Sequence, residues 1–127
     1  MDENKKTIAI LDDNKSITKI FKFMFERKGF NTIIYNNSKT FIESLSDIHF
    51  DALILDLMMP DYSGEEILEQ LDEMNRLKST NVLIHSAKSF PGKVKEKYHN
   101  YKIRTVRKPS KFSTVLKNIE ELISEEN

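Results

Sequence analysis

Cysteine is absent from this 127-residue sequence, and proline and glycine are scarce, with three of each. Without cysteine the chain has neither a disulfide framework nor a thiolate metal site, and this composition is compatible with a reduced, cytoplasmic compartment. Because the prolines and glycines stand singly, no flexible linker marks a domain boundary. We therefore expect a single domain over residues 1–127, which would bury roughly two-thirds of the surface that the unfolded chain exposes.

A net charge and a long apolar run are also missing. Twenty basic residues balance twenty acidic ones, so no overall field indicates binding to nucleic acid or to a membrane. No apolar run approaches the length of a membrane span, and the polar start of the chain is unlike a secretory signal. We expect a soluble cytoplasmic protein. The charge is uneven, however, because ten Lys or Arg and one acid, Glu96, lie between Lys88 and Lys117.

Short apolar runs rich in branched residues alternate with apolar residues at helical spacing. The runs predict five strands, at Ile8–Leu11, Ile33–Tyr35, Ala52–Leu55, Val82–Ile84 and Ile103–Val106. The helical sets are Ile17, Ile20, Phe21, Met24 and Phe25, ended by Gly29; Phe41, Ile42 and Leu45 behind Ser38; Ile67, Leu68, Leu71 and Met74 behind a Ser63/Glu66 capping box; a poorly patterned stretch at Phe90–Tyr98; and Phe112, Val115, Leu116, Ile119, Leu122 and Ile123.

Strict alternation of strands and helices, with strands apolar on both faces, predicts an α/β fold. The architecture is an open, doubly wound parallel sheet covered by helices on both faces. In such sheets the ligand crevice lies beyond the carboxyl ends of the strands. The residues that directly follow each apolar run are therefore the ones to examine for chemistry.

Polar residues follow four of the predicted strands. They are Asp12 and Asp13, Asp56, Ser86 and Lys108. Three carboxylates close together raise one another's pKa unless a cation joins them, and Mg²⁺ prefers such oxygen ligands. A carboxylate can also be the nucleophile that forms an aspartyl-phosphate, while a metal, an ammonium and a hydroxyl share the phosphoryl oxygens. Asp56, Lys108 and Ser86 supply those groups.

These motifs resemble response-regulator receiver domains of two-component phosphorelay signalling, over essentially the whole chain. The matching segments are Leu11-Asp12-Asp13-Asn14, Asp56 through Pro60 to Gly64, Ser86-Ala87 and Lys108-Pro109. The resemblance implies a flavodoxin-like five-stranded sheet of order 2-1-3-4-5 and a cis Lys108-Pro109 bond. It also implies Mg²⁺ held by Asp12, Asp13, Asp56 and the Met58 carbonyl, and no other cofactor. Asp56 would then take its phosphoryl group from a histidine kinase or histidine phosphotransfer protein.

Such a protein is a phosphoprotein switch and not an enzyme, with intrinsic self-phosphorylation and autodephosphorylation only. A phosphatase of the haloacid dehalogenase type would need a second Asp where Met58 stands. A flavodoxin-like cofactor binder would need Ser, Thr and Gly in place of Asp12 and Asp13. A degenerate receiver that only docks partners would lack some of the chemical residues. Ser63 and Gly64 are explained as the start of a helix, without a chemical role. The three histidines are expected to be ordinary surface or partly packed residues.

The predicted output face departs from the family pattern. Thr105 stands where the family has a signalling aromatic, and Lys88 and Met58 occupy positions that tune the lifetime of the phosphoryl group. The face carries Lys93, Lys95, Lys97, Lys102, Arg104, Arg107 and Lys117. Because like charges would oppose one another in a symmetric dimer, we expect a monomer that docks an acidic protein surface. A solvated basic surface without a partner is the alternative.

Overall fold

The computed structural model describes residues 1–125 and places five parallel strands at the centre of the molecule. The strands are β1 (Thr7–Leu11), β2 (Asn31–Tyr35), β3 (Ala52–Leu55), β4 (Asn81–Ser86) and β5 (Ile103–Arg107). Their order across the sheet is β2-β1-β3-β4-β5, which confirms the predicted topology. Every residue of β1, β3 and β4 is buried, as expected for parallel strands with helices on both faces.

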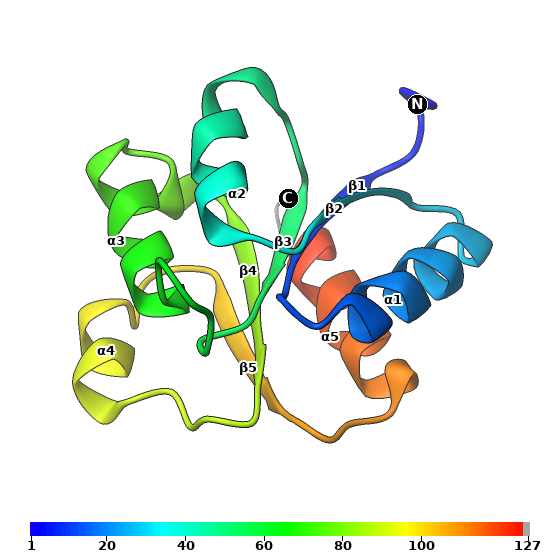
Figure 1. Cartoon of the computed structure of the whole chain (residues 1–127). Coiled ribbons are helices and arrows are strands. Elements are labelled where there is room, and N and C mark those ends of the chain that lie inside the picture. The colour runs from blue at the N-terminus through cyan, green and yellow to red at the C-terminus, as the bar shows by residue number, and fades with distance from the viewer. Residues whose placement is uncertain (126–127) are drawn as a thin grey trace.

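Helices cover the sheet in two layers (Figure 1). The α-helices are α1 (Lys15–Arg27), α2 (Ser38–Ser44), α3 (Gly64–Glu73), α4 (Gly92–Lys97) and α5 (Phe112–Ser124), and 3-10 turns cover Leu45–Asp47 and Leu77–Ser79. Helices α1 and α5 pack on one face, where Phe21, Phe25 and Ile119 join the core. Helices α2, α3 and α4 lie on the other face, where Phe41 and Leu68 join it. None of the helices within residues 1–125 is long and apolar enough to cross a membrane.

The ends of α1 follow from local sequence. The Asn14 side chain accepts hydrogen bonds from the N–H groups of Ser16 and Ile17, which satisfies donors that a helix start leaves free. Gly29 ends the helix at a φ of 94°, a left-handed conformation that glycine adopts without steric cost. The glycine was predicted as the helix stop.

Three details of the predicted helices were wrong. Ile20 was assigned to the core face of α1 but is 55% exposed, and Met74, at the C-terminal end of α3, is 43% exposed. The cap of α2 is Asn37, whose side chain accepts from the Thr40 N–H, and not Ser38. Ser38 is buried instead, and its hydroxyl bonds to the segment after β3, donating to the Pro60 carbonyl and accepting from the Tyr62 N–H.

Candidate phosphorylation site

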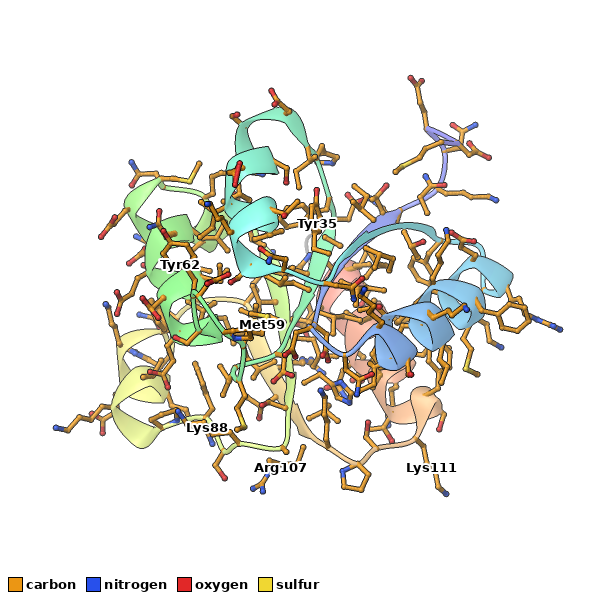
Figure 2. The ribbon with its side chains drawn as sticks, viewed as in Figure 1. Tyr35, Met59, Tyr62, Lys88, Arg107 and Lys111 are labelled. Carbon is orange, nitrogen blue, oxygen red and sulfur yellow. The ribbon has the colours of Figure 1, made fainter. Side chains whose placement is uncertain are left out.

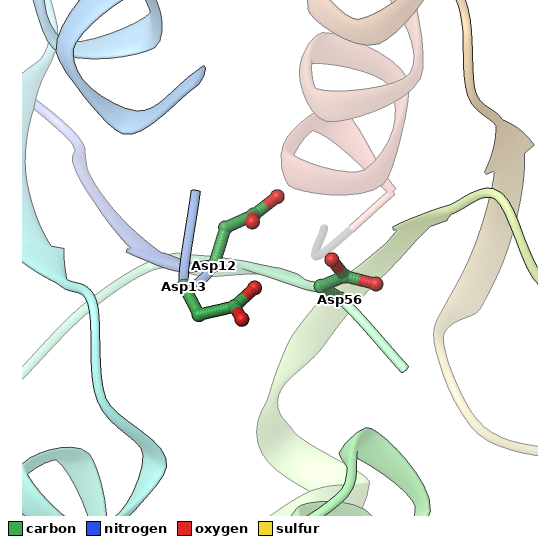
Figure 3. Close-up of side chains that lie close together, drawn as sticks. All are labelled: Asp12, Asp13 and Asp56. Carbon is green, nitrogen blue, oxygen red and sulfur yellow. The ribbon is translucent and has the colours of Figure 1, made fainter. Parts of the chain in front are cut away.

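The predicted acidic residues meet where β1 and β3 end (Figure 3). The sheet's hydrogen bonds continue one residue beyond each strand, because the Asp12 N–H donates to the Tyr35 carbonyl and the Asp56 N–H to the Leu11 carbonyl. Asp12, Asp13 and Asp56 each offer an oxygen within 4.8 Å of the others. Asp12 and Asp56 are buried, whereas Asp13 is exposed.

Lys108 bridges the two buried carboxylates from the end of β5. Its Nζ donates to Asp12 Oδ2 at 2.7 Å and to Asp56 Oδ2 at 3.0 Å, and 17% of its side chain is exposed. Burial disfavours the charged ammonium most strongly, but the hydrogen bonds and charges of Asp12 and Asp56 together raise the pKa of Lys108. Burial likewise raises the pKa of Asp12, against the opposing hydrogen bonds from Lys108 and the Asn14 N–H.

The loop after Asp56 is held tightly against the start of α3. The Met58 N–H donates to Asp56 Oδ1 at 3.1 Å, and the Gly64 N–H donates to the Leu57 carbonyl at 3.0 Å. A Cβ on Gly64 would lie 2.5 Å from the Asp56 carbonyl oxygen and 2.7 Å from Leu57 Cα, distances that no side chain could occupy without moving backbone. The Ser63/Glu66 capping box then starts the helix, as predicted. The close approach at Gly64 was not foreseen, because it depends on tertiary packing.

Ser86 and Lys108 occupy neighbouring strand ends. Ser86 is the last residue of β4 and is 1% exposed, and its carbonyl accepts from the Lys108 N–H at 3.0 Å. Its hydroxyl accepts from the Lys88 N–H at 3.2 Å. The Lys108-Pro109 peptide is cis, as the resemblance implies. Met58 lies directly in the loop after Asp56, and the role of its carbonyl as a metal ligand stays a prediction.

His85 is the polar residue beside this site that sequence reasoning underrated. It was predicted to be a surface or partly packed residue, but it is only 5% exposed. Burial and the nearby Lys108 charge lower its pKa to about 4, so the imidazole is neutral at pH 7. Its position inside β4 could have indicated burial, since all of that strand is buried. His49 and His99 are exposed, as predicted.

Comparison with known proteins identifies the arrangement. The family model of the response regulator receiver domain matches residues 8–120. The chain belongs to this family. It is therefore a receiver domain of the response regulators of two-component signalling, whose members act as signalling switches.

Curated relatives and solved structures agree with this assignment. The receiver domain is 32% identical over 68 residues to the transcriptional regulatory protein FixJ of Rhizobium meliloti, which covers 54% of this chain and 33% of that protein. It is 25% identical over 87 residues to the polar-differentiation response regulator DivK of Brucella ovis, covering 68% of this chain and 71% of that protein. The chain spans a third or less of the length of the first three relatives.

Two solved structures show the same fold. A Francisella response regulator receiver domain has a TM-score of 0.84 at 22% identity and covers 97% of this chain and all of that one. The chemotaxis protein CheY4 of Vibrio cholerae has a TM-score of 0.81 at 20% identity, with 93% of this chain and 98% of that one covered. At these identities the likeness supports the fold alone.

Proposed function

We propose that this receiver domain takes a phosphoryl group onto Asp56. The observation that carries the proposal is the pair of hydrogen bonds from the Lys108 ammonium to Asp56 and Asp12, inside a cluster of three carboxylates at the strand ends. A lysine tied to the acceptor carboxylate stands ready to contact phosphoryl oxygens once that carboxylate is modified. The donor would be a phosphohistidine on a sensor histidine kinase or phosphotransfer protein in the cytoplasm.

The transfer itself needs little covalent chemistry from the protein. A bond forms between an Asp56 carboxylate oxygen and phosphorus while the phosphorus–nitrogen bond of the donor breaks, and the electron pair of that bond returns to the imidazole. Lys108 would neutralise charge on the phosphoryl oxygens, and the Ser86 hydroxyl would donate a hydrogen bond to one of them. Hydrolysis of the resulting acyl phosphate by water restores Asp56 and ends the signal. No separate substrate is turned over, so the domain is a switch.

The donor set of the acidic cluster fits Mg²⁺. Three carboxylates share one ammonium, which leaves excess negative charge among hard oxygen ligands, and Mg²⁺ is usually held by one or two carboxylates together with phosphate and water. Asp12, Asp13, Asp56 and the Met58 carbonyl would hold the ion. Bound there, it would supply charge neutralisation for the phosphoryl oxygens.

Mass spectrometry after treatment with acetyl phosphate tests the acceptor. The wild-type domain should gain one phosphoryl mass in the presence of Mg²⁺, and Asp56→Asn should gain none. Asp61→Asn is the matched control, because Asp61 lies in the same loop, is exposed, and has a φ of 67° that Asn also tolerates. Stoichiometric labelling of Asp56→Asn would show that another residue is the acceptor.

We also propose that the modified domain stays monomeric and docks an acidic protein surface, without direct contact to nucleic acid. Within residues 1–125 the supporting feature is a set of exposed lysines on α4 and α5, including Lys93, Lys97 and Lys117. Attraction between such a surface and an acidic partner would raise the association rate and weaken with salt.

A further inference from the structure

We infer that His85 is a positioning residue for phosphoryl transfer, which holds the loop that delivers Lys108 to Asp56. The inference rests on the proposed function and adds a residue that the family motifs do not contain. His85 lies on β4 next to Ser86 and contacts neither Asp56 nor Asp12 through any hydrogen bond found among residues 1–125. Its effect would therefore pass through the loop between β5 and α5.

The loop between β5 and α5 is hydrogen-bonded to β4 on both sides of Pro109. Before the proline, the Lys108 N–H donates to the Ser86 carbonyl at 3.0 Å. After the proline, the Ser110 hydroxyl and His85 Nε2 form a hydrogen bond of 3.0 Å. Figure 2 shows Arg107 and Lys111, which flank the loop, along one edge of the molecule. Ser86 and His85, adjacent residues of the buried strand β4, thus hydrogen-bond to the loop on either side of Pro109.

The second attachment matters because the loop borders a cavity on its α1 side. A cavity of about 500 Å³ lies between α1 and the loop, lined mainly by apolar residues. Its lining includes Phe21, His85, Lys108, Pro109 and Ser110. Lys108 therefore borders open space on one side and the carboxylates on the other. A side chain with a void beside it lacks the contacts that normally fix its position.

The imidazole suits this task better than a charged or flexible group. It is buried and packs against the Phe21 ring at a centroid distance of 5.3 Å, so its orientation is fixed. Because the ring is neutral, it adds no positive charge beside Lys108. Its Nε2 can pair with the Ser110 hydroxyl in either tautomer, since a serine hydroxyl both donates and accepts.

The expected consequence is kinetic. Lys108 must sit within hydrogen-bond distance of the phosphoryl oxygens in the transition state, and small misplacements of such a group lower the rate strongly. We expect Ser110→Ala and His85→Leu each to slow labelling of Asp56 by acetyl phosphate about tenfold. His85→Gln, which keeps a polar group able to reach Ser110, should recover most of the rate. Ser113→Ala is the matched control, because Ser113 is an exposed serine in the first turn of α5, three residues after Ser110.

The double variant separates one shared interaction from two independent effects. Combining His85→Leu with Ser110→Ala should slow labelling no more than either change alone, since each already removes the same hydrogen bond. If the fold-reductions of the two single variants multiply in the double variant, the two residues act independently and the proposal is wrong. The proposal is also wrong if both single variants label at the wild-type rate while the wild-type domain labels normally. A wild-type domain that does not label at all would instead contradict the proposed function.

Fluorine NMR of the beryllofluoride complex gives a readout that a purely structural role would not move. Beryllofluoride takes the place of the phosphoryl group on Asp56, and the resonance that Lys108→Ala shifts identifies the fluorine facing that ammonium. Ser110→Ala should shift or broaden the same resonance and leave the others in place, whereas Ser113→Ala should change none. An unaltered resonance in Ser110→Ala would show that the loop holds Lys108 without His85.

Discussion

Asp13 differs from the other two carboxylates of the cluster in its surroundings. Asp12 and Asp56 are buried and share the Lys108 ammonium, whereas Asp13 is exposed to water. An exposed carboxylate is directly accessible to a divalent ion from solution. In the proposed function Asp13 would therefore be the carboxylate of the cluster that a Mg²⁺ ion reaches most directly from solvent.

Replacing Asp13 should separate metal binding from folding. Asp13→Ala should weaken Mg²⁺ binding by at least about tenfold, because it removes one of three charges that attract the ion. Labelling of Asp56 should fall with it. The free energy of unfolding should change by no more than about 0.5 kcal/mol, since the side chain is exposed.

Isothermal titration with Mg²⁺ and urea unfolding measure the two quantities. Asp47→Ala, an exposed acid far along the chain in the 3-10 turn after α2, serves as the control. An unchanged Mg²⁺ titration in Asp13→Ala would remove this residue from the proposed site.

His85 should make stability depend on pH. Its pKa is about 4 in the folded domain against an ordinary value of 6.5, so between these values the unfolded chain binds a proton that the folded one does not. The contribution to stability is complete above pH 6.5 and is lost as the pH falls toward 4. At pH 5 the loss should be about 2 kcal/mol relative to neutral pH.

Urea unfolding at neutral pH and at about pH 5 checks this value by comparing variants. His85→Gln should lose much less stability on acidification than the wild type, and His49→Gln should behave like the wild type because His49 is exposed. Equal acid sensitivity of wild type and His85→Gln would assign the effect to other groups.

At the scale of helices and strands, the sequence predicted what depends on local pattern. The apolar run Ala52–Leu55 matches β3 at both ends, because a central parallel strand must be apolar on both faces. Ile20 was misassigned since helical spacing defines a face about 100° wide, but cannot say how far the neighbouring layer extends over it. Ile20 lines the cavity beside the β5–α5 loop instead of packing in the core.

The start of α3 shows how an element and the site are joined. Gly64 lies against the backbone of Asp56 and Leu57, so the position of the helix and that of the proposed acceptor Asp56 are coupled. The sequence suggested only a helix start at this point, because the contact joins the helix to a strand end through backbone atoms. Periodicity carries no information about such a contact.

Gly64→Ala should therefore displace the start of α3 from the end of β3. Overpacking of this kind costs typically about 1–3 kcal/mol, and labelling of Asp56 should slow because its loop must shift. Gly92→Ala is the matched control, since a Cβ there would meet no atom within 4 Å and Gly92 also begins a helix. Unfolding free energies and labelling rates of the two variants should differ clearly. Equal behaviour would show that the backbone yields at Gly64 without cost.

Over the whole molecule, the fold and the meeting of the strand-end residues were predictable because topology determines them. Parallel strands bring their carboxyl ends to one edge, so Asp12, Asp56 and Lys108 had to lie near one another once the strands were located. The pairing of charges on the predicted output face could not be foreseen in this way. Arg104 donates to Glu121 at 2.7 Å and to Glu125 at 2.6 Å within the same chain, so these two acids already neutralise one of the seven cations of the predicted output face.

The other cations of the predicted output face lead to a prediction about self-association of the domain. Arg104 engages Glu121 and Glu125 within the same chain, and Lys93, Lys97 and Lys117 remain exposed. Two such faces would repel each other, and salt screens repulsion between exposed charges. The beryllofluoride-treated domain should therefore sediment as a monomer at low salt, and any weak self-association should increase as salt is added. Sedimentation velocity at about 0.05 M and about 0.5 M NaCl, where the Debye length falls from more than 10 Å to a few ångströms, measures both.

Arg104→Ala is the informative variant, because it frees Glu121 and Glu125 to meet the lysines of a second copy and should promote dimers at low salt. A tight dimer of the unaltered domain at low salt, dissociating as salt rises, would mean that opposite charges pair across this face and that the acidic docking partner is not needed to explain it.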